Sequence, residues 1–156
     1  MIEIFLCRDD VHENLYKLLE AKLSAPFEIL RTENGKPYIE GNHVHFSLSH
    51  SGRRGIIAVS DKPVGIDLEI YKDSPHNSVI ERFSEREQAE IADERDFLRH
   101  WTAREAYVKL YGLTIAETWK HVEFLDGKLY LDGQLQKVTV RTYDFGFSVG
   151  ALCFED

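Results

Sequence analysis

Hydrophobic residues recur with helical spacing in two separate segments, and each of these segments lies among stretches that alternate like β-strands. The first helical segment follows Asp9 or Asp10, either of which can act as its N-cap, and it ends before Pro26. The second follows Asp93 and ends at Gly112, a residue suited to the left-handed position after a helix. Because a helix and a sheet each bury one apolar face, this pattern predicts a helix packed on a small sheet, twice over.

The alternating segments give the expected strands. In the first half we expect strands at the N-terminus and over residues 27–32, 43–50, 55–60 and 64–70, the last three forming an antiparallel meander beneath the first helix. In the second half, a short helix over 84–92 precedes the long one, and Asp126-Gly127 and Asp132-Gly133 are typical of tight turns between strands. The sequence therefore predicts an α+β fold with two similar lobes, about 1–70 and 71–156, each a small antiparallel sheet packed by a helix.

The composition narrows the class of protein: 43% of the 156 residues are hydrophobic and 29% are charged, as in a single globular domain. No segment approaches the ~20 apolar residues of a membrane span, so we expect a cytoplasmic protein without a membrane partner. The net charge of −8 argues against general nucleic-acid binding. Cys7 and Cys153 have no metal-type spacing and are expected to be reduced thiols, with a disulfide between them as the alternative.

Four charged residues from two segments are the strongest candidates for a binding site. Asp67 and Glu69 are two apart in an expected strand, so both leave the same face, where two acids repel each other unless a positive group lies between them. Glu105 and Lys109 are four apart in the second helix and also share a face. Three carboxylates suit a hard cation such as Mg2+, and a lysine one helical turn away is suited to the phosphates that accompany this ion.

These residues lie in motifs that resemble the successive signatures of the 4′-phosphopantetheinyl transferase superfamily. Three segments carry the resemblance: Phe-Ser-Leu-Ser-His-Ser at 46–51, Val-Gly-Ile-Asp-Leu-Glu at 64–69, and Trp101 followed by Glu105-Ala106 and Lys109. Gly35-Lys36-Pro37 matches a further family element upstream. The order of the motifs makes the chain similar to the Sfp-type branch, whose chains contain two pseudo-symmetric α/β lobes with the active site between them.

The resemblance implies a single transferase domain over 1–156. It implies transfer of the phosphopantetheine arm of coenzyme A to a serine of an acyl or peptidyl carrier protein, with release of 3′,5′-ADP. Asp67, Glu69 and Glu105 would hold Mg2+, and Lys109 would contact the pyrophosphate of coenzyme A, the co-substrate. Glu105 is also the favoured base for the carrier serine, either directly or through a water molecule.

Further positions are carried over by the same resemblance. Ser49 and His50 would contact the nucleotide phosphates, and Lys36 and Pro37 would lie near the adenine. Arg104 stands where the family usually has lysine, and it is expected to keep a phosphate contact. Three positions leave alternatives open. Glu87 is a second candidate base and a candidate partner of Ser84 in a capping box, and these two roles do not exclude each other. Arg53 and Arg54 face either the acidic carrier protein or only solvent.

Two other functions remain open at this stage. One is a coenzyme A- or carrier-binding module that has lost catalysis, which the short segment before Ser49 and the substitution at Arg104 motivate. The other is a small Mg2+-dependent phosphohydrolase that uses the same acids with water as the nucleophile. A first lobe shorter than usual could also be completed by self-association, with a monomer as the alternative. The identity of the carrier is left open by the sequence.

Overall fold

The computed structural model describes residues 1–72 and 76–156. The first half contains β1 (Ile2–Arg8), α1 (Val11–Lys22), β2 (Leu30–Arg31), β3 (Pro37–Tyr38), β4 (His45–Ser51) and β5 (Arg54–Ser60). The second half contains β6 (Val64–Ile70), α2 (Asn77–Ile80), α3 (Glu85–Glu90), α4 (Glu94–Tyr111), α5 (Ile115–Thr118), β7 (Val122–Leu125), β8 (Lys128–Leu131), β9 (Gln134–Leu135), β10 (Val138–Asp144) and β11 (Ser148–Glu155).

Two antiparallel three-stranded sheets share one topology, with the orders β1-β5-β4 and β10-β11-β6. In each sheet the strand that comes first in the chain pairs with the last one, and the last one also pairs with the strand just before it. A long helix, α1 or α4, follows the first strand of each sheet. This repeated arrangement confirms the predicted α+β fold of small antiparallel sheets packed by helices.

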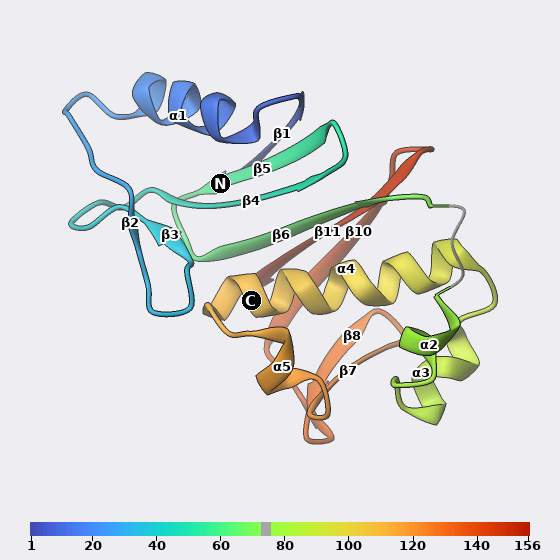
Figure 1. The fold of residues 1–156 in the computed structure, drawn as a ribbon. Helices are drawn as coiled ribbons and strands as arrows, with labels where there is room; N and C mark the ends of the chain where they lie inside the picture. The colour runs from blue at the N-terminus through green and yellow to red at the C-terminus, as the bar shows by residue number, and fades with distance from the viewer. Residues whose placement is uncertain (73–75) are drawn as a thin grey trace.

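The elements are stacked in layers, as Figure 1 shows: α1 lies at the top, β4 and β5 beneath it, then β6, β10, β11 and α4, with β7 and β8 at the bottom. Apolar clusters fill the spaces between these layers. One lies between α1 and the first sheet, one between the two sheets, and one between the second sheet and α4. Each buried Leu or Ile side chain contributes about 1.5–3 kcal/mol to these contacts.

The strand β6 lies in a different sheet from the one predicted. The sequence placed it in a meander with β4 and β5, whereas it pairs with β11 in the second sheet. The change from the first sheet to the second therefore falls at the turn over residues 61–63, before β6, and not after residue 70. This is a correction to the expected lobe boundary.

The strands β4 and β6 lie side by side without a backbone ladder, because serine side chains of β4 take its place. Ser47 Oγ accepts a hydrogen bond from the Ile66 N–H (3.0 Å), and Ser51 Oγ accepts one from the Ile70 N–H (3.2 Å). Ser47, Ser49 and Ser51 alternate along β4 and so share one face of the strand. The structure buries that face against β6, since Ser47, Ser49 and Ser51 are each less than 9% exposed.

The helix α4 packs unusually close to β6 at Gly65. A Cβ atom placed on Gly65 would lie 2.0 Å from the Ala106 carbonyl oxygen and 2.5 Å from the Leu110 backbone nitrogen. Only a residue without a side chain allows this approach. The close packing brings the face of α4 that carries Glu105 and Lys109 against the strand that carries Asp67.

The helix ends and turns were predicted well from local sequence signals. The Asp10 carboxylate accepts hydrogen bonds from two backbone N–H groups of α1, and Gly112 has φ +65° after α4. Asp126-Gly127 and Asp132-Gly133 form the turns that join β7, β8 and β9. The expected strand over 27–32 is shorter, with only Leu30–Arg31 paired.

Two further observations concern the cysteines and the helices. Cys7 and Cys153 are both free thiols, and Cys153 is buried on β11. Within the described part of the chain, every helix is too short or too polar to cross a membrane.

Candidate active site

Asp67 is the most buried of the predicted site residues that lie together, with 3% of its surface exposed. Its Oδ1 atom accepts hydrogen bonds from Lys109 Nζ (2.8 Å) and from Ser49 Oγ (2.8 Å). Its Oδ2 atom is buried and has no hydrogen-bond partner. Burial raises the pKa of Asp67, and the nearby charge of Lys109 opposes this rise. A buried carboxylate oxygen without a partner is costly, so Oδ2 marks a position where a donor or a cation would be stabilising.

Glu105 and Glu69 face the same space as Asp67. Burial raises the pKa of Glu105 to about 7, and the negative charges of Asp67 and Glu69 contribute to the rise while Lys109 opposes it. This mutual effect arises because the three carboxylates lie near one another between β6 and α4. Glu69 is fixed from the side of β4, where its Oε2 atom accepts a hydrogen bond from Ser51 Oγ (2.9 Å).

The donor set fits a hard cation in its chemistry. The charges of Asp67 and Glu69 act on Glu105, and one carboxylate oxygen atom, Asp67 Oδ2, is buried without a partner. No three His, Cys, Asp or Glu residues in the ranges 1–72 and 76–156 are grouped closely enough to hold a metal ion as they stand. The assignment of Asp67, Glu69 and Glu105 as ligands of Mg2+ therefore stays a prediction.

A cavity of about 200 Å3 opens beside Lys109, toward the C-terminal end of α4. Its walls come from the turn at residues 34–37, from β4 and from residues that follow α4. Asn34 holds the turn in place, because its Nδ2 atom donates to the Gly112 carbonyl (2.9 Å). The structure thus places Lys36 and Pro37 next to Lys109, in the wall of one cavity.

Lys36 differs from its expected role in one respect. Its ammonium group donates a hydrogen bond to the Leu110 carbonyl, one of the last carbonyls of α4. Burial lowers the pKa of Lys36. The side chain therefore stabilises the end of the helix, while its methylene groups form part of the cavity wall.

Ser49 and His50 separate in the structure. Ser49 is 8% exposed and donates its hydroxyl hydrogen to Asp67, so it orients this carboxylate. His50 is exposed at the end of β4 and is free to meet a ligand from solvent. The sequence grouped the two as phosphate contacts because they are adjacent. Adjacent residues of a strand point to opposite faces, however, and this accounts for their different surroundings.

Arg104 does not lie where the sequence placed it. Only 1% of its surface is exposed, and its guanidinium pairs with Glu87 and donates to the Val122 carbonyl. The same group lies over the rings of Phe83 (4.8 Å) and Trp119 (5.2 Å). Enclosed in this way, Arg104 cannot reach a phosphate group in the cleft, so the predicted contact with the coenzyme is wrong.

Glu87 is the buried partner of Arg104 and not a base open to substrate. It has no exposed surface, and its Oε1 atom accepts a hydrogen bond from the Phe124 N–H (3.0 Å) and lies 3.2 Å from His100 Nδ1. Burial would raise its pKa, but the hydrogen bond with His100 and the charge of Arg104 produce a net decrease. The catalytic role predicted for Glu87 is therefore wrong, because the carboxylate is enclosed.

The capping box is only half formed. Ser84 Oγ accepts a hydrogen bond from the Glu87 N–H (3.2 Å), as predicted, but the Glu87 side chain turns inward. Sequence reasoning also missed His100, which has the helical spacing i, i+4 to Arg104 and so shares its face. The spacing of His100 and Arg104, on a helix that also carries aromatic residues, was the sequence signal that could have predicted a buried polar network.

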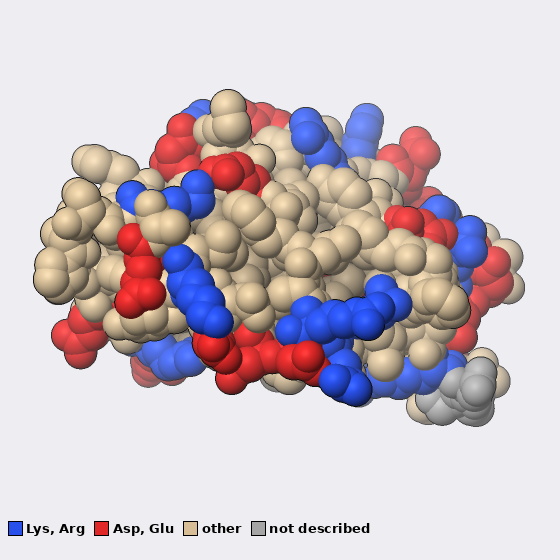
Figure 2. Space-filling view, turned by 90° about the horizontal axis from the view of Figure 1, so that it is seen from above, with Lys and Arg blue, Asp and Glu red and all other residues tan. Residues whose placement is uncertain are grey.

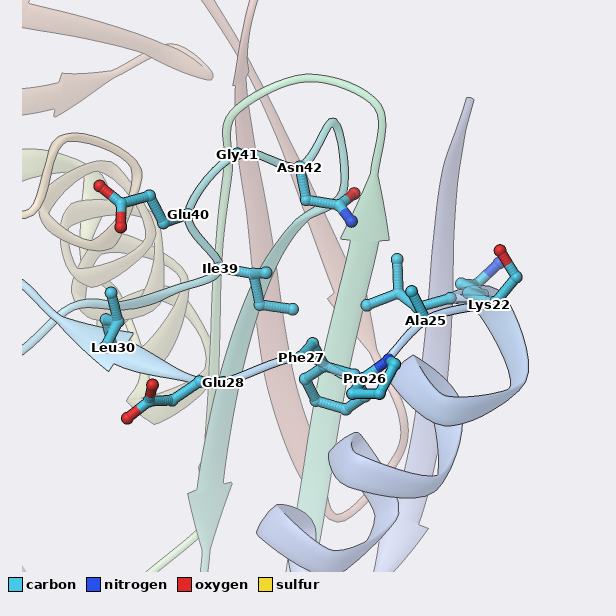
Figure 3. Close-up of a pocket in the computed structure, with 12 residues that line it drawn as sticks. Lys22, Ala25, Pro26, Phe27, Glu28, Leu30, Ile39, Glu40, Gly41 and Asn42 are labelled. Atoms are coloured by element: carbon cyan, nitrogen blue, oxygen red, sulfur yellow. The ribbon is translucent and has the colours of Figure 1, made fainter.

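Of two other hollows, only the smaller one borders the candidate site. An apolar hollow of about 170 Å3 borders Glu69, with Ile70, Phe97 and Trp101 in its walls. A larger cavity of about 440 Å3 lies in the first lobe, where Phe27 and Ile39 face each other across it (Figure 3). None of the predicted site residues lines this larger cavity.

Comparison with known proteins adds independent information on the same region. Residues 63–146 match the family model described as the 4′-phosphopantetheinyl transferase superfamily. The chain is 39% identical over 87 residues to a 4′-phosphopantetheinyl transferase of Bacillus subtilis, covering 51% of this chain and 39% of that protein.

Two longer alignments extend toward the N-terminus. The chain is 35% identical over 120 residues to the 4′-phosphopantetheinyl transferase psf-1 of Bacillus pumilus, covering 71% of this chain and 48% of that protein. It is 26% identical over 147 residues to the 4′-phosphopantetheinyl transferase Sfp of Bacillus subtilis strain 168, covering 84% of this chain and 64% of that protein. The chain thus spans about half the length of the curated relatives it matches.

Proposed function

The chain belongs to the 4′-phosphopantetheinyl transferase superfamily and is similar to its Sfp-type members, and from this premise we propose that it is a transferase acting on carrier proteins. The reaction would move the 4′-phosphopantetheine group from coenzyme A to a serine of an acyl or peptidyl carrier protein. The observation that carries the proposal is the cluster of Asp67, Glu69, Glu105 and Lys109 between β6 and α4, inside the segment that matches the family model.

The two hollows at the ends of this cluster suggest how coenzyme A would lie. We place its nucleotide in the cavity lined by Lys36, Pro37 and Lys109, where an ammonium group meets the pyrophosphate. The pantetheine arm would then run toward the apolar hollow beside Glu69 and Trp101. This orientation puts the bond that breaks between Lys109 and Glu105.

In the proposed reaction, the serine oxygen of the carrier forms a bond to the phosphorus atom that bears the pantetheine. The bond from this phosphorus to the bridging oxygen of the pyrophosphate breaks, and its electron pair leaves with 3′,5′-ADP. Lys109 offsets the negative charge that gathers on the pyrophosphate oxygens. The serine proton passes to Glu105 or to a water molecule at its side.

Mg2+ is the cofactor that this donor set would hold, through Asp67, Glu69 and Glu105. When bound, it would supply positive charge that stabilises the phosphoryl group during transfer. We propose the cytoplasm as the setting of the reaction.

The test is the intact mass of an apo acyl carrier protein after incubation with this protein, coenzyme A and Mg2+, with EDTA added in a parallel sample. We expect the carrier to gain the mass of phosphopantetheine in the first sample and not in the second. A mass gain that persists in EDTA would refute the role of the metal. Coenzyme A binding without a mass gain on acyl and peptidyl carriers would favour the inactive binding module.

A further inference from the structure

Phe147 is the most exposed large hydrophobic side chain of the second lobe, with 74% of its surface open to solvent. It lies in the turn between β10 and β11. The turn is accounted for by other residues, since Gly146 adopts φ +86° and its N–H donates to Asp144 Oδ1 (2.9 Å). The turn geometry therefore does not require a phenylalanine at position 147.

The turn between β4 and β5 lies beside the Phe147 ring, and an arginine at this turn approaches the ring. The Arg54 guanidinium lies 5.6 Å from the centre of the Phe147 ring. Both turns pack at the end of β6: a Cβ atom on Gly52 would lie 3.1 Å from Ile70 Cδ1, and the Tyr71 N–H donates to the Phe147 carbonyl (3.1 Å). In Figure 1 the β4–β5 hairpin, the β10–β11 turn and the end of β6 gather at the right-hand side of the molecule. Phe147 and Arg54 thus form one patch built from two hairpins.

This patch lies at the Glu69 end of the carboxylate cluster. Glu69 immediately precedes Ile70 on β6 and is held by Ser51, the last residue of the hairpin strand β4. The cavity assigned to the nucleotide lies at the opposite end, beside Lys36. In the proposed function the nucleotide occupies the cavity beside Lys36, and the acceptor serine attacks phosphorus from the side opposite the leaving 3′,5′-ADP. This is the Glu69 side, where the serine would approach alongside the pantetheine arm.

The charges around the patch favour an acidic partner. Over the face seen in Figure 2, basic and acidic side chains are interspersed, so a charged partner must be recognised locally. Two acids in this part of the second lobe are paired, Asp144 with Arg95 (3.0 Å) and Glu94 with His76 (3.2 Å). The Arg54 guanidinium, in contrast to these ion pairs, lies over the Phe147 ring. Aromatic residues, phenylalanine among them, and arginine are both enriched in the cores of protein interfaces.

We propose that Phe147 and Arg54 are the docking surface for the acidic carrier protein. The ring would anchor an apolar residue of the carrier, and the guanidinium would meet one of its carboxylates. This inference rests on the proposed function, because the carrier is the partner that this function requires. It assigns an interaction to two residues that lie outside the carboxylate cluster and outside the coenzyme cavity.

The test measures the dissociation constant of an apo acyl carrier protein whose acceptor serine is replaced by alanine, so that no transfer can occur during the titration. We compare the wild type with Phe147→Ser and Arg54→Glu. The matched controls are Leu135→Ser, an exposed apolar residue on β9, and Arg141→Glu, an arginine that lies over the Phe154 ring (5.3 Å) elsewhere on the second sheet. Urea unfolding and coenzyme A affinity are recorded for every variant.

We expect each patch variant to weaken carrier binding about tenfold or more and each control to leave it within about twofold. Raising the salt concentration should weaken the wild type more than Arg54→Glu. Coenzyme A affinity and the free energy of unfolding should stay near the wild-type values in all four variants, since the replaced side chains lie at the surface.

The outcomes separate this inference from the proposed function. Carrier binding that the patch variants weaken, without any transfer by the wild type, would sustain the docking surface and refute the transferase. Efficient transfer by the wild type, with a carrier dissociation constant that Phe147→Ser and Arg54→Glu leave unchanged, would sustain the transferase and refute the docking surface. Three further results would each overturn the docking surface. The first is no carrier binding by the wild type, and the second is a loss of coenzyme A affinity in the patch variants. The third is that the patch substitutions dissociate a dimer of this chain and do not weaken carrier binding.

Discussion

The Lys109 ammonium lies 2.8 Å from Asp67 Oδ1, which joins the last turn of α4 to the middle of β6 across the candidate active site. Each of the two residues comes from a separate motif, and the contact spans 42 positions of the chain. The other carboxylate oxygen of Asp67 is buried without a partner. The pair is therefore an ion pair with one coordination position left over, and this combination suits a phosphate–metal site better than a purely structural role.

Asp67→Asn tests this interpretation. The amide keeps the shape of the side chain and can still accept a hydrogen bond from Ser49, so we expect the free energy of unfolding to change by less than about 1.5 kcal/mol. The rate of carrier modification should fall about 100-fold or more, because the charge proposed to hold Mg2+ is lost. The control is Asp61→Asn, at an exposed acid that pairs with the N-terminus. A variant rate within about twofold of the wild type would remove Asp67 from the site.

The raised pKa of Glu105 predicts how stability depends on pH in the metal-free protein. The folded state keeps this proton up to about pH 7, whereas the unfolded chain releases it near the ordinary value of 4.5. The stability that the Glu105 proton contributes to the folded state is therefore fully present below about pH 4.5 and is lost as the pH rises through 7. After allowance for solvent screening of this half-buried group, the loss is on the order of 1–2 kcal/mol.

Urea unfolding in EDTA at pH 5 and pH 8 measures this effect, with Glu105→Gln as the reference. The glutamine variant should lose less stability over this interval than the wild type, because it has no proton to release. Equal losses in the two proteins would show that Glu105 titrates normally, and that the three carboxylates are farther apart in solution than in the structure.

The sequence predicted the elements around the site more accurately than their partners. The predicted strand at 64–70 coincides with β6, and the predicted helix after Asp93 coincides with α4, because periodicity and caps are local signals. The sheet to which β6 belongs is not a local property. The apolar run from Val64 to Ile70 would suit a strand beside β5 as well as one beside β11, so tertiary packing decides between them.

Arg104 shows the same limit at the level of a single residue. Its place between Trp101 and Lys109 suggested a group that faces the substrate, because its neighbours in the motif do. Its side chain leaves another face of the helix and meets Glu87, which lies 17 positions earlier. A motif gives the order of residues along the chain, whereas the helical rotation decides which of them reach the cleft.

The Glu87–Arg104 pair predicts a large effect on stability. Replacing either residue alone by alanine leaves the other charge buried, which costs about 3–5 kcal/mol. Replacing both residues by alanine should cost less than the sum of the two single replacements. The control is Arg86→Ala, which removes a pair with Glu123 on a largely exposed arginine and should cost less than about 1 kcal/mol. Urea unfolding measures all of these, and additive single and double replacements would contradict the direct pairing.

Gly65→Ala predicts a coupled loss of stability and activity. The added methyl group would lie 2.0 Å from the Ala106 carbonyl oxygen, far inside the usual contact distance, so α4 has to move away from β6. Overpacking of this kind costs about 1–3 kcal/mol. The same movement separates Lys109 from Asp67, and a displacement of about 1 Å at a catalytic group can slow a reaction about 100-fold.

The comparison variant is Gly127→Ala, in the β7–β8 turn. Gly127 has φ +74° with no atom within 4 Å of an added Cβ, so alanine there strains the backbone by about 1 kcal/mol without touching α4. Urea unfolding and the rate of carrier modification per folded molecule should both fall in Gly65→Ala, whereas only stability should fall in Gly127→Ala. A Gly65→Ala protein that is less stable but reacts at the wild-type rate once folded would show that the close contact at Gly65 supports the core and does not position Lys109.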